Sequence, residues 1–538
     1  MQYNLADLFE SCVDVVPDRP ALVMDDGTRL TFAELDKEAN KVAHHLLAAG
    51  IKAGDHVGCH MINGLPYVAS MLGCFKIRAV PVNINYRYVR EELEYLYKDA
   101  DLVGLIFDDE FAERVKEVAD GIDGLRHLVL VGDATQDVLP KGTVRWSDVI
   151  PGMSASREGF PQRSPDDLYI LYTGGTTGMP KGVMWRHEDI FFAGMGGGNP
   201  VGEPVTRPDE LAEWVAASGE MVMLSAPPLM HGAAFLGCFI SWFGGRTTVI
   251  PTRFSGPSVC QLIQDEKAFT LSIVGDAMAV PIVEALEQGE FDCSGLFIIS
   301  SAGAILSQST QDRLKAAMPQ VFIMDNYGSS ETGFNGTATD DSSSDSGLRF
   351  KVNERTNVIA DDHTIVAPGS VTEGRVAQSG HIPLGYYNAP QKTAETFPTV
   401  EGRRWVLTGD RATVDEDGVI HFIGRGSVCI NTGGEKVFPE EVESALKAHP
   451  AIRDTIVAGV PDERFGQRVG AVLELVPGAE QPSQEDVAAH LADRIARYKV
   501  PRLIHIVDEV VRSPVGKPDY RWAARTLTEV DQARRSEH

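Results

Sequence analysis

The chain has 538 residues, of which 43% are hydrophobic and 23% are charged, a balance typical of a globular protein. This length exceeds one ordinary hydrophobic core, so we expect two or more domains. The 49 basic and 76 acidic residues give a formal net charge of −27, and a field of that sign repels nucleic acid and anionic lipid. We therefore expect no nucleic-acid partner.

The cysteines and the first residues of the chain indicate a cytoplasmic protein. None of the seven cysteines belongs to a Cys-x-x-Cys pair, which argues against a zinc site and against a disulfide framework. Residues 1–20 are acidic and lack a basic region followed by an apolar core, so no signal peptide is expected. The longest apolar stretch, residues 232–245, is shorter than the ~20 residues that a membrane-spanning helix requires. We expect a buried helix there and no transmembrane segment.

Short runs rich in β-forming residues alternate with amphipathic stretches over much of the chain. This alternation predicts a layered α/β fold with mostly buried strands. We expect strands at residues 21–24, 56–61, 103–107, 128–131, 168–171, 221–225, 296–300 and 321–324, and helices at 35–49 and 281–288.

A domain boundary is predicted near Gly424-Arg425-Gly426, where the composition becomes polar and rich in glycine. The residues that follow it are numerous enough for a separate domain, with strands expected at 455–459, 470–476 and 503–507 and a helix at 484–498. We therefore expect a large N-terminal domain over residues 1–424 and a smaller, mobile α+β domain over residues 425–538. A hinge is expected near residues 425–428, because flexible linkers commonly absorb domain motion.

The most informative segment reads Tyr-Thr-Gly-Gly-Thr-Thr-Gly-Met-Pro-Lys-Gly-Val, at residues 172–183. A strand leading into such a loop presents backbone N–H groups, hydroxyls and one cation to the same point, which suits a polyphosphate. Lys181 lies between Pro180 and Gly182, so the segment does not match a P-loop. The phosphate-binding residues predicted here are Thr173, Gly174, Gly175, Thr176, Thr177, Gly178 and Lys181.

A second glycine cluster, at residues 194–198, nearly spells the dinucleotide-binding fingerprint. Asn199 occupies its last glycine position, so we interpret this cluster as a flexible turn.

A third segment, Asn-Tyr-Gly-Ser-Ser-Glu-Thr-Gly at residues 326–333, follows an apolar run. A strand end that carries an aromatic ring, hydroxyls and a carboxylate suits a nucleotide. The ring of Tyr327 would contact adenine, Ser330 the α-phosphate and Glu331 a magnesium ion. Ser301, Ala302 and Gly303 follow another strand and lack bulk, so a planar base or an acyl carbonyl could approach their backbone.

The loop at 172–183 resembles the phosphate-binding loop of the adenylate-forming (ANL) superfamily, which includes acyl-CoA synthetases, luciferases and peptide-synthetase adenylation domains. Gly174 stands where the family usually has serine, and a neighbouring threonine hydroxyl could supply the missing donor. Residues 326–333 resemble the family's Tyr-Gly-x-Thr-Glu motif, with Ser330 in place of threonine. This resemblance implies that Asn326 holds the adenine amine and that Tyr327 and Gly328 line the nucleotide site.

The same resemblance implies roles for residues that composition alone would leave as caps, core or surface. Asp410, in Thr-Gly-Asp, matches the ribose site, and Arg425 is a second candidate for ribose or phosphate. Ser301, Ala302 and Gly303 match the motif that lines the adenine and acyl pocket. His231 would border the acyl carboxylate and position the substrate.

Two further matches lie in the expected C-terminal domain. Lys517, in Arg-Ser-Pro-Val-Gly-Lys, matches the family's terminal lysine, whose ammonium stabilises the charge that develops when a carboxylate attacks the α-phosphate. Gly433 and Gly434 match the segment that lines the pantetheine tunnel during thioester formation. Ser427 departs from the family, which usually carries Asp or Lys at this hinge position.

The resemblance spans nearly the whole chain, from residue 30 to Lys517, and implies an AMP-forming acyl-CoA synthetase. Such an enzyme takes a small-molecule carboxylic acid, Mg²⁺, ATP and coenzyme A. The acid attacks ATP to give acyl-AMP, and the CoA thiol then displaces AMP while the small domain reorients. A homo-oligomer is possible.

The apolar segment after His231 bears on the acid. Gly232, Ala233, Ala234 and Gly237 offer space, which favours a bulky hydrophobic acid over acetate; the alternative is that these small residues serve helix packing. The segments at residues 183–186, 196–199 and 426–433 are similar to those of actinobacterial ligases for steroid side-chain acids. Medium- or long-chain fatty acids, and an acyl-AMP ligase with a non-CoA acceptor, are the alternatives.

The motifs also bear on three other classes of protein. Peptide-synthetase domains place an Asp soon after the His231 region, where this chain reads Ala-Ala-Phe-Leu, so they are disfavoured. A catalytically silent regulator would require loss of Lys517 or Glu331, and both are present. Luciferase-type oxidation is not distinguished by these motifs.

Overall fold

Two eight-stranded sheets organise the first part of the computed structural model, which describes the chain apart from residues 174–178, 201, 290, 305, 339–348, 426–427, 433–434, 463–465, 493, 496, 513–515 and 537–538. In the first sheet β12, β13 and β14 run parallel, so their carboxyl ends meet at one edge. The order of its strands is β15 (Gly333–Ala338), β14 (Phe322–Ser329), β13 (Ile298–Ala302), β12 (Thr270–Ile273), β10 (Val222–Ser225), β11 (Thr247–Ile250), β1 (Pro20–Met24) and β2 (Arg29–Thr31).

The second sheet carries the hairpin that flanks the glycine-rich loop. Its strands β8 and β9 are antiparallel and place Thr173 opposite Lys181, so the two ends of the loop lie side by side. β19 pairs with the outer edge of β9 and places Tyr386 opposite Val183. The order of this sheet is β19 (Gly385–Tyr386), β9 (Lys181–Arg186), β8 (Leu168–Thr173), β4 (Val80–Asn83), β3 (His56–His60), β5 (Leu102–Asp108), β6 (His127–Val131) and β7 (Val144–Arg145).

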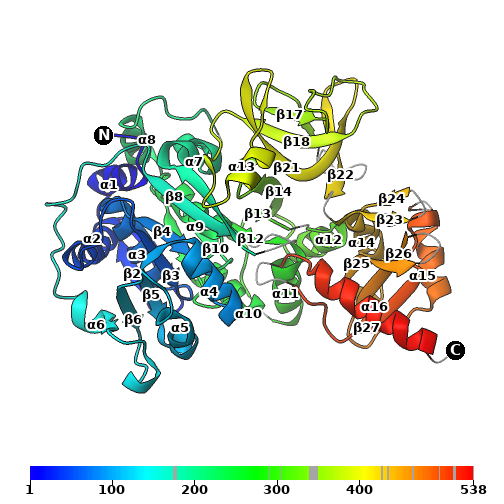
Figure 1. Ribbon diagram of the computed structural model, residues 1–538, viewed down its shortest axis with the longest axis horizontal. Coiled ribbons are helices and arrows are strands. Elements are labelled where there is room, and N and C mark those ends of the chain that lie inside the picture. Colours follow the sequence, from blue (N-terminus) through cyan, green and yellow to red (C-terminus); the bar gives the residue numbers. More distant parts are fainter. Residues whose placement is uncertain are drawn as a thin grey trace.

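Helices pack against both sheets, as Figure 1 shows. In chain order they are α1 (Leu5–Val15), α2 (Phe32–Ala48), α3 (Leu65–Lys76), α4 (Arg90–Asp99), α5 (Ala112–Ala119), α6 (Trp146–Val149), α7 (His187–Gly194), α8 (Glu210–Ala217), α9 (Gly232–Trp242), α10 (Gly256–Glu266), α11 (Gly275–Gln288), α12 (Gln308–Ala317) and α13 (Pro390–Thr396). Short 3₁₀ turns occur at Asp109–Phe111, Gln136–Val138 and Gly196–Gly198.

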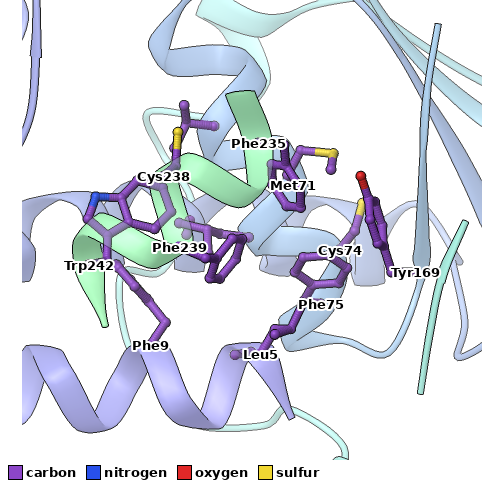
Figure 2. Packing of buried hydrophobic residues seen from close by; sticks show 14 of the residues in the cluster. Leu5, Phe9, Met71, Cys74, Phe75, Tyr169, Phe235, Cys238, Phe239 and Trp242 are labelled. Carbon is purple, nitrogen blue, oxygen red and sulfur yellow. The ribbon is translucent and has the colours of Figure 1, made fainter. Parts of the chain in front are cut away.

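The main core surrounds α9, whose aromatic side chains face α1, α3 and β8 (Figure 2). The ring of Trp242 lies 5.3 Å from that of Phe9, and Phe239 lies 5.3 Å from Trp242, centroid to centroid. Phe235 packs 5.3 Å from Tyr169 of β8. Burial of such large side chains stabilises the fold by about 2 kcal/mol each. It also fixes α9, and therefore His231 immediately before it, against the second sheet.

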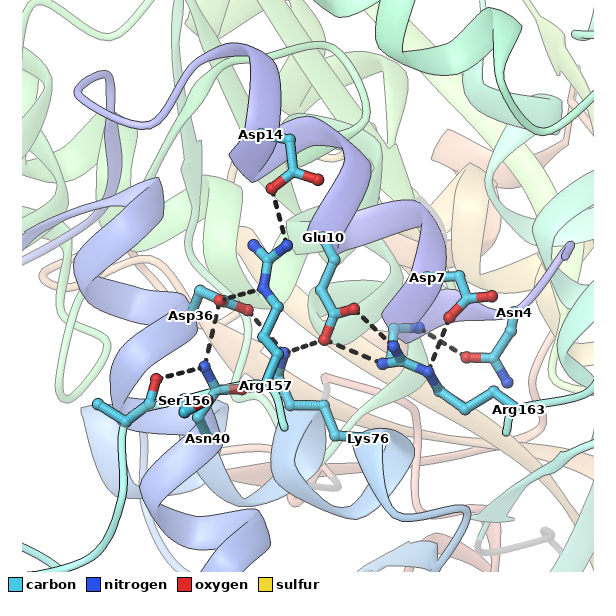
Figure 3. Close-up of polar contacts among 12 residues, drawn as sticks. Asn4, Asp7, Glu10, Asp14, Asp36, Asn40, Lys76, Ser156, Arg157 and Arg163 are labelled. Atoms are coloured by element: carbon cyan, nitrogen blue, oxygen red, sulfur yellow. Dashed lines mark hydrogen bonds and ion pairs between the residues drawn. The ribbon is translucent and has the colours of Figure 1, made fainter. Parts of the chain in front are cut away.

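A buried charge network joins α1, α2 and α3 (Figure 3). Lys76, whose side chain is fully buried, donates to Glu10 at 2.5 Å and to Asp36 at 2.6 Å. Arg157 pairs with Asp36, and Arg163 pairs with Glu10. Burial opposes ionisation of Glu10, but Arg163 and Lys76 outweigh it and lower the pKa of that carboxyl to about 2. The three helices are therefore held together by charge as well as by apolar packing.

A third sheet and a small C-terminal unit complete the chain, with the C-terminal unit beside α11 and α12 (Figure 1). The third sheet contains β16 (Arg349–Lys351), β17 (Thr356–Ile359), β18 (Gly374–Ser379), β20 (Thr399–Val400), β21 (Arg403–Val414) and β22 (Val419–Arg425). The C-terminal unit contains β23 (Ile430–Thr432), β24 (Glu435–Val437), α14 (Pro439–Lys447), β25 (Ile452–Asp462), β26 (Gly466–Leu475), α15 (Gln484–Leu491), a 3₁₀ turn (Arg497–Lys499), β27 (Leu503–Val507) and α16 (Tyr520–Ser536).

The predicted fold class is confirmed: a large layered α/β part precedes a smaller α+β part. The boundary between residues 424 and 425 stays a prediction. Three local expectations need correction. The helix expected at 281–288 begins at Gly275, and the helix expected at 484–498 ends at Leu491. The glycine cluster at 194–198 is a packed turn rather than a flexible one, because a Cβ at Gly197 would lie 2.6 Å from Pro204.

None of the helices within the described residues combines the length and the apolar character needed to cross a bilayer.

Candidate active site

The carboxyl ends of β13 and β14 form one wall of the candidate site. Asn326 lies opposite Ala302 in the parallel register, and its Nδ2 donates to Ser300 Oγ at 2.7 Å. The Ser301 hydroxyl accepts from the Gly275 N–H at 3.1 Å, and the residue is fully buried, so it joins β13 to the start of α11. Gly303 has a φ of +83°, and the nearest atom to a Cβ there would be Val274 Cγ1 at 3.8 Å. The backbone is therefore open to close approach at this point.

Tyr327 and Asp410 meet across two sheets. The Tyr327 hydroxyl donates to Asp410 Oδ2 at 2.6 Å, and its ring packs edge-on against Phe422 of β22 at 4.6 Å between centroids. Asp410 lies opposite Arg425 in the β21–β22 register. Tyr327 and Asp410, both predicted to contact the nucleotide, are thus neighbours. The hydrogen bond between them joins the third sheet to the end of β14. Position 328 requires glycine for packing as well, because a Cβ there would collide with the Gly333 carbonyl in the β14–β15 hairpin.

Glu331 and Lys181 are connected through Tyr386. The Tyr386 hydroxyl donates to Glu331 Oε1 at 3.0 Å, and Lys181 Nζ lies 5.4 Å from the centre of the Tyr386 ring. This distance is within the range of a cation–π interaction. Burial and the nearby Lys392 lower the pKa of Lys181, whereas Glu331 opposes that shift. The carboxylate predicted to hold magnesium and the lysine predicted to hold phosphate therefore face the same place.

Two further predicted residues can be placed and several cannot. The Ser330 carbonyl accepts from Trp185 Nε1 at 2.9 Å, which ties this turn to β9. Thr173 ends β8 opposite Lys181. The predicted residues Gly174, Gly175, Thr176, Thr177, Gly178, Gly433 and Gly434 lie outside the described residues, as does the side chain of Arg425.

His231 and Lys517 lie close enough for their charges to interact, although 286 positions separate them in the chain. His231 is partly exposed, but its Nε2 is buried and has no hydrogen-bond partner among the described residues. Burial, with Lys517 and Arg87 adding to it, lowers the pKa of His231 to about 3. The imidazole is therefore neutral at physiological pH and can accept a hydrogen bond or shape a pocket, but it cannot supply a positive charge.

The small residues of α9 divide into two groups. A Cβ at Gly232 would lie 2.6 Å from Leu171 Cδ2, and Ala234 is fully buried, so these two serve packing rather than substrate space. At Gly237 the nearest atom to a Cβ would be Ser225 Oγ at 3.8 Å, and Ala233 is exposed. The expectation that all four offer space is corrected to Ala233 and Gly237.

Comparison with known proteins decides the family. The family described as AMP-binding enzyme matches residues 9–387, and the family described as AMP-binding enzyme C-terminal domain matches residues 441–517. The chain belongs to the AMP-binding enzyme family. It is 45% identical over 525 residues to a Mycobacterium tuberculosis protein named medium/long-chain-fatty-acid–CoA/3-oxocholest-4-en-26-oate–CoA ligase, covering 97% of this chain and 95% of that protein.

Two other comparisons agree with this assignment. A Rhodococcus rhodochrous protein named 3-oxocholest-4-en-26-oate–CoA ligase is 44% identical over 533 residues, covering 97% of this chain and 96% of that protein. The crystal structure of the anthranilate CoA ligase AuaEII with anthranoyl-AMP superposes with a TM-score of 0.83 at 25% identity, covering 99% of this chain and 98% of that one.

This AMP-binding enzyme is an ATP-dependent, AMP-forming acyl-CoA ligase that uses ATP, Mg²⁺ and coenzyme A. It converts a carboxylic acid to acyl-AMP and then transfers the acyl group to CoA. The described residues contain no cluster of three or more His, Cys, Asp or Glu side chains that could hold a metal by itself. Glu331 nevertheless fits Mg²⁺, because this ion is commonly held by one or two carboxylates together with the phosphates of a nucleotide.

Tyr386 is the residue of this AMP-binding enzyme that sequence reasoning missed. It sits in Gly-Tyr-Tyr-Asn at 385–388, where both the first and last residues have positive φ, +143° and +49°. A glycine and an asparagine that bracket two aromatic residues are typical of a turn, and here the turn follows β19, in which Tyr386 is buried. That pattern was a usable signal, but its partners Glu331 and Lys181 lie far away in sequence.

Proposed function

We propose that this ligase activates a bulky hydrophobic carboxylic acid, with a steroid side-chain acid as the first candidate. The observation that carries the proposal is the full-length identity of 44–45% to ligases whose names specify 3-oxocholest-4-en-26-oate. The open positions at Ala233 and Gly237 on α9 support it, because they follow directly on His231. A medium- or long-chain fatty acid is the second candidate, since the Mycobacterium tuberculosis relative carries that substrate in its name as well.

For the predicted site residues we propose the roles that the family resemblance implies. The loop at 173–178 and Lys181 hold the phosphates, Asn326, Tyr327 and Gly328 hold adenine with the backbone of Ser301, Ala302 and Gly303, and Asp410 and Arg425 hold ribose. Glu331 holds Mg²⁺, Ser330 contacts the α-phosphate and His231 borders the carboxylate. Lys517 serves adenylate formation, whereas Gly433 and Gly434 serve thioester formation.

Two further proposals concern the whole chain. We propose a domain boundary at 424/425, which falls before the last residue of β22, with the hinge at 425–428, before β23 begins at Ile430. We place the protein in the cytoplasm, where its seven free thiols would stay reduced.

The substrate is tested by measuring ATP-dependent AMP and pyrophosphate release with and without CoA. The acids are acetate, octanoate, palmitate, an aryl acid and a steroid side-chain acid. We expect CoA-dependent turnover to be fastest with the steroid acid. Highest turnover with octanoate or palmitate would support the second candidate instead. Pyrophosphate release without thioester would indicate an acceptor other than CoA.

Substitution at Gly237 tests where the acid lies. We expect Gly237→Leu to lower kcat/KM for the steroid acid by about tenfold or more while changing acetate or octanoate turnover less, because the added side chain occupies the open face of α9. Ala233→Ser, on the same helix, keeps the volume small and is the control. An equal loss with all acids would place the acyl group elsewhere.

A further inference from the structure

The C-terminal unit is tied to α11 by a buried ion pair. Lys447, at the end of α14, places its Nζ 2.8 Å from Asp276 Oδ2 on the first turn of α11. Both side chains are less than a tenth exposed, at 8% and 7%. Asp276 is itself fixed, because its other oxygen accepts from the backbone N–H of Ser307 at 2.9 Å and from its hydroxyl at 3.1 Å. The pair therefore joins two parts of the chain at a defined point.

This ion pair continues toward the catalytic end of the chain. Lys447 Nζ also lies 3.1 Å from Asp454 Oδ1 on β25, and Asp454 accepts two bonds from Arg512 at 2.5 and 2.6 Å. Arg512 Nη1 donates to the Gly516 carbonyl at 2.9 Å. Gly516 immediately precedes Lys517. An unbroken series of charges thus runs from α11 to the peptide group beside Lys517.

Gly516 returns to the same end of α11. It has a φ of +71°, and a Cβ there would collide with Cβ of Ala277, the residue next to Asp276. Glycine is needed both for the backbone conformation and for this contact. Two adjacent residues of α11 therefore contact the C-terminal unit: Asp276 pairs with Lys447, and Ala277 packs against Gly516.

The buried charges depend on one another. Burial would lower the pKa of Lys447, but Asp276 and Asp454 outweigh it and raise that pKa. Burial would raise the pKa of Asp454, but Lys447 and Arg512 lower it to about 2. Removal of one member leaves an uncompensated charge at its neighbour, which is strongly unfavourable in a buried setting. The series therefore holds as a unit.

We propose that Asp276, Lys447, Asp454 and Arg512 are positioning residues that fix the backbone beside Lys517 against α11 for adenylate formation. The proposal rests on the proposed function of Lys517. A second ion pair across the same interface, Arg453 with Glu284, is about a third exposed. Arg453 also pairs with Glu474, which accepts from the Val510 N–H, so this pair reaches the C-terminal segment before Arg512 rather than at Gly516.

The test measures acyl-AMP formation and thioester formation separately in the Lys447→Met variant. We expect kcat for acyl-AMP formation, measured as pyrophosphate release, to fall at least about tenfold, with the KM for ATP little changed. Thioester formation from supplied acyl-AMP and CoA should change less than about twofold, which also shows that the variant is folded. Lys499→Met, which removes a lysine paired with Glu441 within the C-terminal unit, is the matched control and should affect neither step.

Combination with Lys517→Ala decides whether the series acts through Lys517. We expect Lys447→Met to cost nothing further in adenylate formation once Lys517 is absent, and Asp276→Asn to behave in the same way. Equal losses in both half-reactions, or additive losses in the Lys517→Ala background, would overturn the positioning role. If Lys517→Ala alone leaves adenylate formation intact, the proposed function of Lys517 fails first, and the positioning role fails with it.

Discussion

At the level of single residues, the contact between Tyr386 and Glu331 governs how the carboxylate is presented. The tyrosine hydroxyl fixes one oxygen of Glu331, and the ring of the same tyrosine lies under the Lys181 ammonium. Burial, together with the charge of Glu331, raises the pKa of Tyr386 above its ordinary value, so the hydroxyl stays protonated and remains a donor. A single side chain therefore orients both the proposed metal ligand and the proposed phosphate ligand.

We predict that Glu331→Gln weakens the use of Mg-ATP. Glutamine keeps an acceptor for Tyr386 but loses the charge that attracts the cation, so the apparent KM for Mg-ATP should rise about tenfold, equivalent to about 1.4 kcal/mol. Pyrophosphate release measured against Mg²⁺ concentration checks this. Tyr386→Phe, which keeps the charge and loses only the hydrogen bond, should have a smaller effect. An unchanged Mg²⁺ dependence in Glu331→Gln would remove Glu331 from the metal site.

The residues of the site could be predicted from the sequence where they belong to a short motif. The contacts between those residues could not. Tyr327 and Asp410 were each expected near the nucleotide, yet the bond between them joins residues 83 positions apart. Tyr386 lies 55 positions from Glu331 and was not predicted. Local composition reports which groups can bind a phosphate or a metal. Which groups meet depends on the pairing of sheets, which no local pattern records.

At the level of elements, the three N-terminal helices depend on Lys76. Its ammonium lies between Glu10 of α1 and Asp36 of α2, with no exposed surface of its own (Figure 3). Lys76→Met would keep the length of the side chain and leave both carboxylates short of a partner. We expect a loss of about 3–5 kcal/mol in the free energy of unfolding, because one member of a buried network is removed.

Denaturant unfolding measures this loss. Lys98→Met is the matched control, since Lys98 pairs with Glu94 on the exposed face of α4 and should leave the stability unchanged within error. If the two variants are equally stable, Lys76 makes no net contribution to the packing of these helices.

A second element, α14, carries a carboxyl that is protonated at neutral pH. Burial, together with Glu440, raises the pKa of Glu443 to about 8, although the Val457 N–H donates to it at 2.9 Å. The folded chain therefore binds this proton more tightly than the unfolded chain, for which the ordinary value is 4.5. Its contribution to stability falls as the pH rises from about 4.5 to about 8, by roughly 1 kcal/mol per pH unit.

We predict that Glu443→Gln flattens this dependence, because the amide resembles the protonated acid and does not ionise. The free energy of unfolding of the variant should increasingly exceed that of the natural chain between pH 5 and pH 8. Unfolding at a series of pH values measures the two slopes, with the exposed Glu441→Gln as the control. Parallel slopes for Glu443→Gln and the natural chain would show that Glu443 is ionised in the folded state.

The elements themselves were predictable to different degrees. Strands with continuous apolar runs, such as those expected at 56–61 and 128–131, appear as β3 (His56–His60) and β6 (His127–Val131). The third sheet was largely missed, because its strands are polar and irregular and derive their order from pairing with one another. α15 ends at Leu491, although the sequence pattern predicts that the helix continues to residue 498.

At the level of the whole molecule, the proposed active site combines residues from two parts of the chain. The proposed nucleotide-binding residues lie at sheet edges and in loops of the large part, whereas Lys517 belongs to the C-terminal unit. The position of Lys517 is set through α11, which meets both Lys447 and Gly516. The overall charge of −27 repels ATP at long range, so the affinity for nucleotide must come from this local geometry.

The central claim, that Lys517 serves only the first of two half-reactions, is tested most directly by Lys517→Ala. Pyrophosphate release from acid and ATP should fall by at least about a hundredfold, because the developing charge on the α-phosphate loses its cation. Thioester formation from supplied acyl-AMP and CoA should remain within about twofold of the natural enzyme. Equal loss of both steps, or no loss of the first, would contradict this division of labour.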